Sequence, residues 1–343
     1  MSHDPKFINA CSNGHLKIAK QLVELYPQIN ISAHNDSAFA SACSNGHLEV
    51  AKWLIHINPL INVSASNGAF RYTCLNGYLE VAKWLVELYP QINISAHNGS
   101  AFASACSNGH LEGAKWLIHI NPLINVSAQN NGAFRYACSN GHIEVAKWLV
   151  QSCPSLNISA YNNFAFRYAC LNGHLEVAKW LIHINPLINV SAQNNEAFRY
   201  ACSNGHLEVA KWLVQITPSE NVCANVKFEA FVGACAYDHL EVAKWLVELY
   251  PQINISARNN LAFQSACSNA HPEVAKWLVH IRPYNYVLEL DETQSRILDW
   301  RIRPIQEVKW LERAIPILAY NSKTGNIFQM LNYDTVRYIC NFV

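Results

Sequence analysis

The chain has 343 residues, of which 51% are hydrophobic and 14% are charged, and its formal net charge is +1 at pH 7. A composition this apolar and this poor in charge is not that of a disordered chain, so we expect the chain to fold. Because the net charge is close to zero, no overall field favours nucleic acid or an acidic membrane surface as a partner.

Targeting and membrane signals are missing from the sequence. Its first ten residues, MSHDPKFINA, lack the basic start and the apolar stretch of a secretory signal. No run of about 18 uninterrupted apolar residues, the length needed to span a bilayer, occurs along the chain. We therefore expect a cytoplasmic protein with no membrane partner.

A repeat of 31 to 33 residues begins near residue 4 and continues to about residue 290. Self-similarity at such a period is typical of solenoid proteins, in which each unit packs only on its neighbours. The period is marked most clearly by nine cysteines: Cys11, Cys43, Cys74, Cys106, Cys138, Cys170, Cys202, Cys235 and Cys267. Eight tryptophans keep the same step: Trp53, Trp84, Trp116, Trp148, Trp180, Trp212, Trp245 and Trp277.

Each unit reads as two short helices, and residues 68–96 show the pattern. Phe70, Thr73 and Cys74 have the spacing of one apolar helix face. Gly77 then ends this helix, and a second apolar stripe runs over residues 81–88. Pro90 removes the backbone donor that a continuing helix would need. The predicted unit is helix, tight turn, helix and loop.

The recurring string Asn-Gly-His-Leu-Glu-Val-Ala-Lys-Trp-Leu, followed by Ile-Asn-Val-Ser-Ala, resembles the ankyrin repeat over about residues 4–290. The asparagine-rich, cysteine-bearing style is similar to the ankyrin arrays of giant DNA viruses of amoebae. The resemblance implies an all-α solenoid of about nine helix-turn-helix units, covering residues 1–290. One departure is that the family's Thr-Pro-Leu-His opening is replaced by strings such as Gly-Ala-Phe-Arg.

The repeat erodes towards the C-terminus, where Asp238 and Ala270 replace glycine. The segment 306–311 still resembles the second-helix string, and Trp310 lies 33 residues after Trp277. These features predict a degenerate tenth repeat and a helical C-terminal cap over residues 291–343, since the outer face of a terminal repeat meets water.

The recurrent cysteines and histidines do not predict a metal site or a cofactor. Zinc needs four ligands within about 2 Å, and equivalent residues one repeat apart cannot converge in that way. The cysteines are interpreted as free core thiols and the histidines as structural. No phosphate loop, nucleophile elbow or paired carboxylate appears outside the repeated Glu-Lys pattern, so no catalytic residues are predicted and the chain is not expected to be an enzyme.

The residues after the first-helix phenylalanine vary most between copies, and four copies carry an Arg-Tyr pair. Arginine and tyrosine are enriched at interface hot spots, whereas family resemblance also allows packing between repeats, and both interpretations stay open. The candidate partner-binding residues are Arg71, Tyr72, Arg135, Tyr136, Arg167, Tyr168, Arg199 and Tyr200.

The resemblance implies a monomeric scaffold that binds one or more partner proteins through its concave face, lined by the first helices, and through its loop tips. No nucleic-acid partner is expected. An alternative is a substrate adaptor that recruits host ubiquitin-ligase machinery through the C-terminal tail, with the host cytoplasm as its location if the protein is viral.

Overall fold

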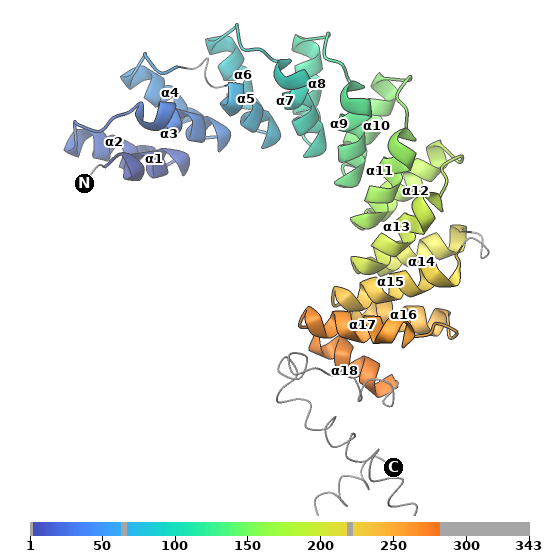
Figure 1. Cartoon of the computed structure of the whole chain (residues 1–343). Coiled ribbons are helices and arrows are strands. Elements are labelled where there is room, and N and C mark those ends of the chain that lie inside the picture. The colour runs from blue at the N-terminus through green and yellow to red at the C-terminus, as the bar shows by residue number, and fades with distance from the viewer. Residues whose placement is uncertain (1–2, 63–66, 218–221, 282–343) are drawn as a thin grey trace, which may run out of the picture. The chain divides into compact units, whose positions relative to one another are not determined.

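A computed structural model describes residues 3–62, 67–217 and 222–281, and all the regular secondary structure in this part of the chain is α-helical. Its 18 helices pair in chain order into helix-turn-helix repeats, which we number 1 to 9 (Figure 1). The all-helical class and the repeat period predicted from the sequence are confirmed. The predicted tenth repeat and cap at 291–343 lie outside the described residues.

The odd-numbered helices are the first helices of the repeats. They are α1 (Asp4–Ser12), α3 (Ala33–Ser44), α5 (Asn67–Leu75), α7 (Ala96–Ser107), α9 (Ala128–Ser139), α11 (Ala160–Leu171), α13 (Ala192–Ser203), α15 (Ala224–Ala236) and α17 (Ala257–Ser268). The even-numbered helices are the second helices. They are α2 (Leu16–Leu25), α4 (Leu48–Ile57), α6 (Leu79–Leu88), α8 (Leu111–Ile120), α10 (Ile143–Ser152), α12 (Leu175–Ile184), α14 (Leu207–Ile216), α16 (Leu240–Leu249) and α18 (Pro272–Ile281).

The described residues fall into two compact units. Unit 1 comprises residues 1–201 and 208–221, and unit 2 comprises residues 202–207 and 222–343, each as far as it is described. Within unit 1 each first helix packs on the first helix of the next repeat from α1 to α11, and within unit 2 α15 packs on α17. Figure 1 shows the first and second helices of unit 1 as two separate rows.

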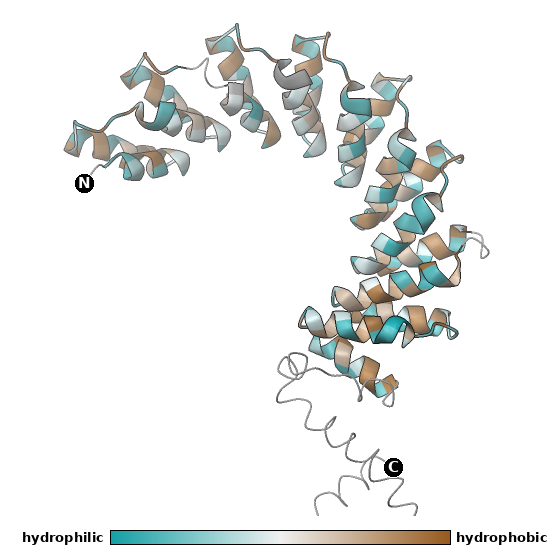
Figure 2. Cartoon of the chain, viewed as in Figure 1, coloured by the Kyte–Doolittle hydropathy of each residue, from teal (hydrophilic) through white to brown (hydrophobic). Residues whose placement is uncertain are grey.

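The core of each repeat is built from the apolar stripes that the sequence predicts. First helices bury a phenylalanine, alanines and the ladder cysteine, and second helices bury a Val-Ala-Leu set, for example Val145, Ala146 and Leu149. Each helix therefore carries both hydrophobic and hydrophilic residues along its length (Figure 2). The tryptophans are only half-buried. Seven of the rings, all but that of Trp245, contact the first-helix phenylalanine of the preceding repeat at centroid distances of 6.2–6.4 Å, as in Phe134 and Trp180.

The turn between the two helices explains the glycine that recurs there in repeats 1 to 7. In repeat 1, Gly14 has a φ of 73°, and the backbone N–H groups of Gly14 and His15 donate to the carbonyls of Cys11 and Ala10 at 3.2 and 2.9 Å. This bonding pattern is the Schellman end of a helix. A Cβ atom on Gly14 would also lie 2.5 Å from the His47 ring of repeat 2. Glycine is favoured here because it adopts the left-handed backbone without strain and leaves room for the ring that packs on it.

A feature that the sequence did not predict lies at the start of the first helices. Three consecutive residues there have φ between 51° and 64° in repeats 2, 5, 6, 7 and 9, at residues 34–36, 129–131, 161–163, 193–195 and 258–260. The middle residue is asparagine each time, one of the few side chains that tolerate this conformation. Each of these five helices thus begins with one left-handed turn.

Candidate functional site

The four candidate arginines lie on the first helices, where two of them are buried. Arg135 and Arg167 are each 8% exposed, and Arg71 and Arg199 are half-buried. Arg135 donates from Nε to the carbonyl of Asn130 and from Nη2 to that of Gln129, both at 3.0 Å. These two carbonyls belong to the left-handed turn of the arginine's own repeat.

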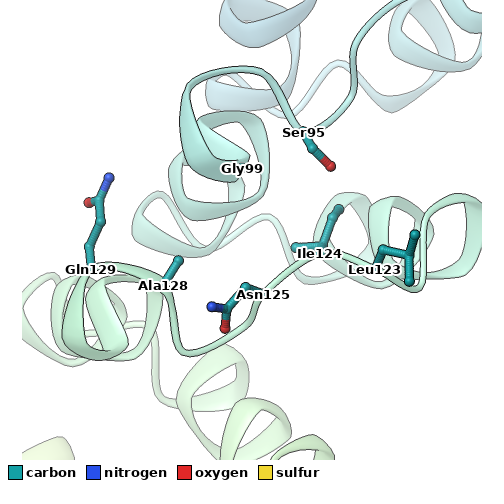
Figure 3. Close-up of a pocket in the computed structure, with 7 residues that line it drawn as sticks. All are labelled: Ser95, Gly99, Leu123, Ile124, Asn125, Ala128 and Gln129. Carbon is teal, nitrogen blue, oxygen red and sulfur yellow. The ribbon is translucent and has the colours of Figure 1, made fainter.

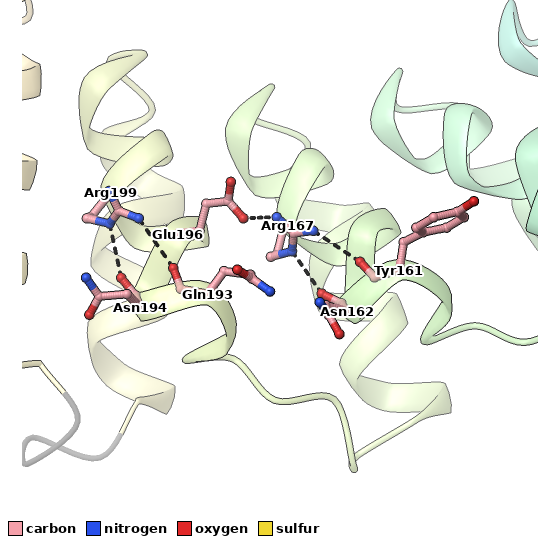
Figure 4. A network of polar contacts seen from close by, with 7 residues as sticks. All are labelled: Tyr161, Asn162, Arg167, Gln193, Asn194, Glu196 and Arg199. Carbon is pink, nitrogen blue, oxygen red and sulfur yellow. Dashed lines mark hydrogen bonds and ion pairs between the residues drawn. The ribbon is translucent and has the colours of Figure 1, made fainter.

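The same hydrogen bonds recur in the next two repeats. Arg167 donates to Asn162 and Tyr161 at 2.8 and 3.1 Å, and Arg199 donates to Asn194 and Gln193 at 3.0 and 3.3 Å. Figure 4 shows both guanidinium groups directed at these carbonyls. In repeat 9, Gln264 takes over the role through a bond of 2.8 Å to Asn259. A left-handed turn leaves carbonyls without helical partners, and a planar donor five residues later satisfies two of them.

Arg167 also forms an ion pair with Glu196 of the following repeat (Figure 4). The two side chains are nearly buried, and burial lowers the pKa of Arg167 from its ordinary value. The side chains that hold the turn in repeat 6 therefore also join repeat 6 to repeat 7. For the arginines, packing within and between repeats accounts for most of the guanidinium contacts.

The candidate tyrosines are more accessible than the arginines. Tyr72 and Tyr136 are each 45% exposed, and Tyr168 and Tyr200 are half-buried. In repeat 3 the guanidinium of Arg71 lies 4.7 Å from the ring centroid of Tyr72. In repeats 5 to 7 the arginine therefore holds the backbone of the turn, whereas Tyr72 and Tyr136 reach the surface.

Repeats 5 and 6 bring three aromatic rings together around Arg135 and a fourth against one of these three, and we call Tyr136, Tyr161, Phe164 and Tyr168 the aromatic cluster. Phe164 stacks on Tyr168 with centroids 3.9 Å apart, and Tyr136 meets Phe164 edge-on at 5.9 Å. The Arg135 guanidinium lies 4.5 Å from the Tyr161 ring and 4.7 Å from the Phe164 ring. Tyr161 is 55% exposed, and its hydroxyl accepts a hydrogen bond from Asn130 at 2.7 Å. Arg135 and Asn130 hold the rings in place, and the rings of Tyr136 and Tyr161 are open to solvent.

Two members of the aromatic cluster, Tyr161 and Phe164, were missed by the sequence prediction. Phe164 occupies a position that is Ser37, Gly68, Ser100, Gly132, Glu196, Glu229 or Leu261 in the other repeats with this motif. An aromatic residue at a position that is otherwise small, charged or aliphatic was the available signal. Its meaning depends on the left-handed turn, which places Tyr161 beside it.

The ladder cysteines are buried, as predicted. Burial raises the pKa of the thiols, to about 12 for Cys11, Cys43, Cys74 and Cys267, so they are neutral and unreactive at physiological pH. Of the cysteines outside the ladder, Cys223 is exposed and Cys153 is half-buried, while Cys340 lies outside the described residues. No group of three or more histidine, cysteine or acidic side chains within the described ranges is placed to hold a metal ion.

A family model described as ankyrin repeats (3 copies) matches residues 5–67, 105–195, 134–226 and 198–287, which together make up more than half of the chain. No curated protein matches the sequence. Among the described helices, none has the length and apolarity required to cross a membrane.

Proposed function

Because the chain belongs to the ankyrin repeat family, we propose that it is a scaffold that binds a partner protein through the first helices of unit 1 and their left-handed turns. The observation that carries this proposal is the aromatic cluster. Tyr136 and Tyr161 are large, exposed and fixed by their neighbours, so they lose little conformational entropy when a partner covers them.

The surroundings of the cluster support a partner with an uncharged contact surface. The cation nearest the rings, Arg135, is buried and already donates to two carbonyls. The exposed side chains beside it on the turns are amides, namely Gln129, Asn130 and Asn162. Rigid aromatic anchors surrounded by adaptable amide groups are the composition of antibody binding sites.

The experiment that tests this proposal is capture of binding proteins from cell extract with the full chain and with the double variant Tyr136→Ala, Tyr161→Ala. Hot-spot tyrosines contribute about 2 kcal/mol or more each, so the variant should retain its unfolding midpoint and bind roughly a thousandfold more weakly. The matched control is Lys147→Ala on α10, which lies in the second-helix row and should bind as the wild type does. Equal binding by the double variant and the wild type would contradict the aromatic cluster as the contact surface.

The finer assignments made from the sequence stay predictions. These are a giant-virus origin, a cytoplasmic location, a monomeric state and recruitment of ubiquitin-ligase components. The tail on which the adaptor alternative depends lies outside the described residues.

A further inference from the structure

Repeats 2 and 4 have nearly the same amino-acid sequence. At both positions where they differ, repeat 4 has a glycine in place of a larger residue. Residues 33–65 and 96–128 agree everywhere except that Asp36 is matched by Gly99 and Val50 by Gly113. Any property that separates the two repeats must therefore arise from these two positions or from the neighbouring repeats.

Asp36 has a definite role in repeat 2. Its side chain is 9% exposed, and its Oδ2 accepts a hydrogen bond of 3.0 Å from the backbone N–H of Asn62, in the loop that leaves α4. Repeat 1 makes the same bond with Asp4, whose Oδ1 accepts from the N–H of Asn30 at 3.1 Å. In both repeats a carboxylate bridges the start of the first helix to the loop that follows the second.

Repeat 4 lacks this carboxylate, and a pocket of about 400 Å³ lies where it would be. The pocket is lined by Ser95, Gly99, Leu123, Ile124, Asn125, Ala128 and Gln129. Figure 3 shows Gly99 and Asn125 on opposite sides of this space. A Cβ atom on Gly99 would have its nearest neighbour at 3.8 Å, on Ile124, so the pocket has room for the missing side chain.

In repeat 4 the corresponding donor is the backbone N–H of Asn125, an exposed residue. Asn125 is the counterpart of Asn62. Its carbonyl accepts from Ala128 and its side-chain Oδ1 accepts from Ser127, at 3.0 Å each. No described residue accepts a hydrogen bond from the backbone N–H of Asn125.

We propose that this pocket, the Gly99 pocket, binds a carboxylate group carried by the aspartate of a peptide segment, which accepts a hydrogen bond from the backbone N–H of Asn125. The carboxylate takes the place that Asp36 and Asp4 fill internally in their repeats. None of the lining residues is acidic, so nothing in the pocket repels the charge. Leu123 at the rim is 91% exposed and favours a ligand with an apolar group beside the acid, which a peptide supplies and a free small carboxylate does not.

The test uses nuclear magnetic resonance of the full chain labelled with ¹⁵N-asparagine, in which the Asn125 signal is identified by its loss in Asn125→Asp. Three probes are titrated: acetate, the capped peptide Leu-Asp-Leu, and the capped peptide Leu-Ala-Leu as the probe without a side-chain carboxylate. We expect the Asn125 amide signal to move saturably with Leu-Asp-Leu, to move at concentrations at least tenfold higher with acetate, and to stay in place with Leu-Ala-Leu.

Variants taken from the sister repeats provide the controls. Gly99→Asp and Gly99→Asn rebuild the missing side chain with and without a charge, and both residue types occupy the same left-handed position in Asp36 and Asn131, so both should fold and lose the response. Gly113→Val restores the other difference and should keep it. Asp36→Gly should open a second pocket, so that the Asn62 signal responds as well.

The outcomes separate the possibilities. An equal response to acetate and Leu-Asp-Leu would support the carboxylate site with a free small acid as its ligand. The same response in the wild type and in both Gly99 variants would overturn the proposal. Neither result depends on the aromatic cluster, so the test stands or falls separately from the scaffold function.

Discussion

A buried guanidinium group needs hydrogen-bond acceptors, and Arg135 finds them in the turn that precedes its own helix. Replacing it by alanine removes two charge-assisted bonds and the cation beneath the aromatic cluster. We expect Arg135→Ala to lower the free energy of unfolding by about 1–3 kcal/mol. Tyr136→Ala, one residue further on and exposed, should change it by less than about 1 kcal/mol. Urea unfolding followed by circular dichroism measures both, and equal losses would contradict a structural role specific to the arginine.

Gly113 is a second residue at which a single substitution should change the free energy of unfolding in a clear direction. The other repeats from 2 to 9 carry a buried valine here, such as Val50, Val81 and Val145, and a Cβ atom on Gly113 would approach its nearest neighbour only to 3.8 Å. Valine lowers the backbone entropy cost and fills apolar space. Gly113→Val should therefore raise the free energy of unfolding by about 1–3 kcal/mol in the same assay. A destabilised variant would show that the space is not apolar.

Between elements, neighbouring repeats meet where a histidine ring lies on the glycine of the preceding turn. His110 illustrates the contact: its Nε2 lies 2.9 Å from the carbonyl of Leu75, and its ring covers Gly77. Tyr78 fills the equivalent place over Gly46, so an aromatic ring is what the position requires. The ring is packed against the turn of the preceding repeat, which is the structural role expected from the sequence.

Two members of this histidine row are expected to make stability depend on pH. Burial and the neighbouring His110 lower the pKa of His142, and burial with His206 lowers that of His239. The unfolded chain, in which histidine has its ordinary pKa of about 6.5, then binds protons first. The contribution of the two neutral histidines to the free energy of unfolding is complete above a pH of about 6.5. It is lost as the pH falls from there through the lowered pKa values of the folded protein.

Urea unfolding midpoints should accordingly be lower at pH of about 5.5 than at pH of about 7.5. His142→Tyr copies the arrangement of Tyr78 and removes one titrating group, so this variant should lose less stability between the two pH values than the wild type. Midpoints that do not change with pH would mean that these rings are not buried as described.

At the scale of the whole molecule, the repeat boundaries, the helix pairs and the apolar stripes could all be predicted from the sequence. They follow from local spacing copied nine times. The left-handed turns could not, because Asn130 and its equivalents become recognisable only once Arg135 is seen to bind the carbonyls beside them. The Gly99 pocket was also hidden: the change from Asp36 to Gly99 is visible in the sequence, but the hydrogen bond that it removes is a tertiary contact.

Contacts limited to neighbouring repeats predict that a pair of repeats can be removed without unfolding the rest. Deleting residues 64–126 joins Val63 to Ser127, so that the junction reads Asn-Val-Ser-Ala, as it does at residues 125–128 of the natural chain. Repeat 2 then meets repeat 5 in place of repeat 4, and the surface that it presents differs from that of repeat 4 only at Asp36 and Val50. The new interface should therefore form as the natural interface between α7 and α9 does.

The shortened chain should keep its helical signal per residue in circular dichroism and elute as one symmetric peak in size-exclusion chromatography. It should also keep partner capture, because the aromatic cluster of repeats 5 and 6 is untouched. The amide signal of Asn62, which takes the place of the deleted Asn125, should not respond to Leu-Asp-Leu, because Asp36 already accepts its hydrogen bond. Aggregation or loss of helicity would show instead that repeats 3 and 4 support the array beyond their immediate neighbours.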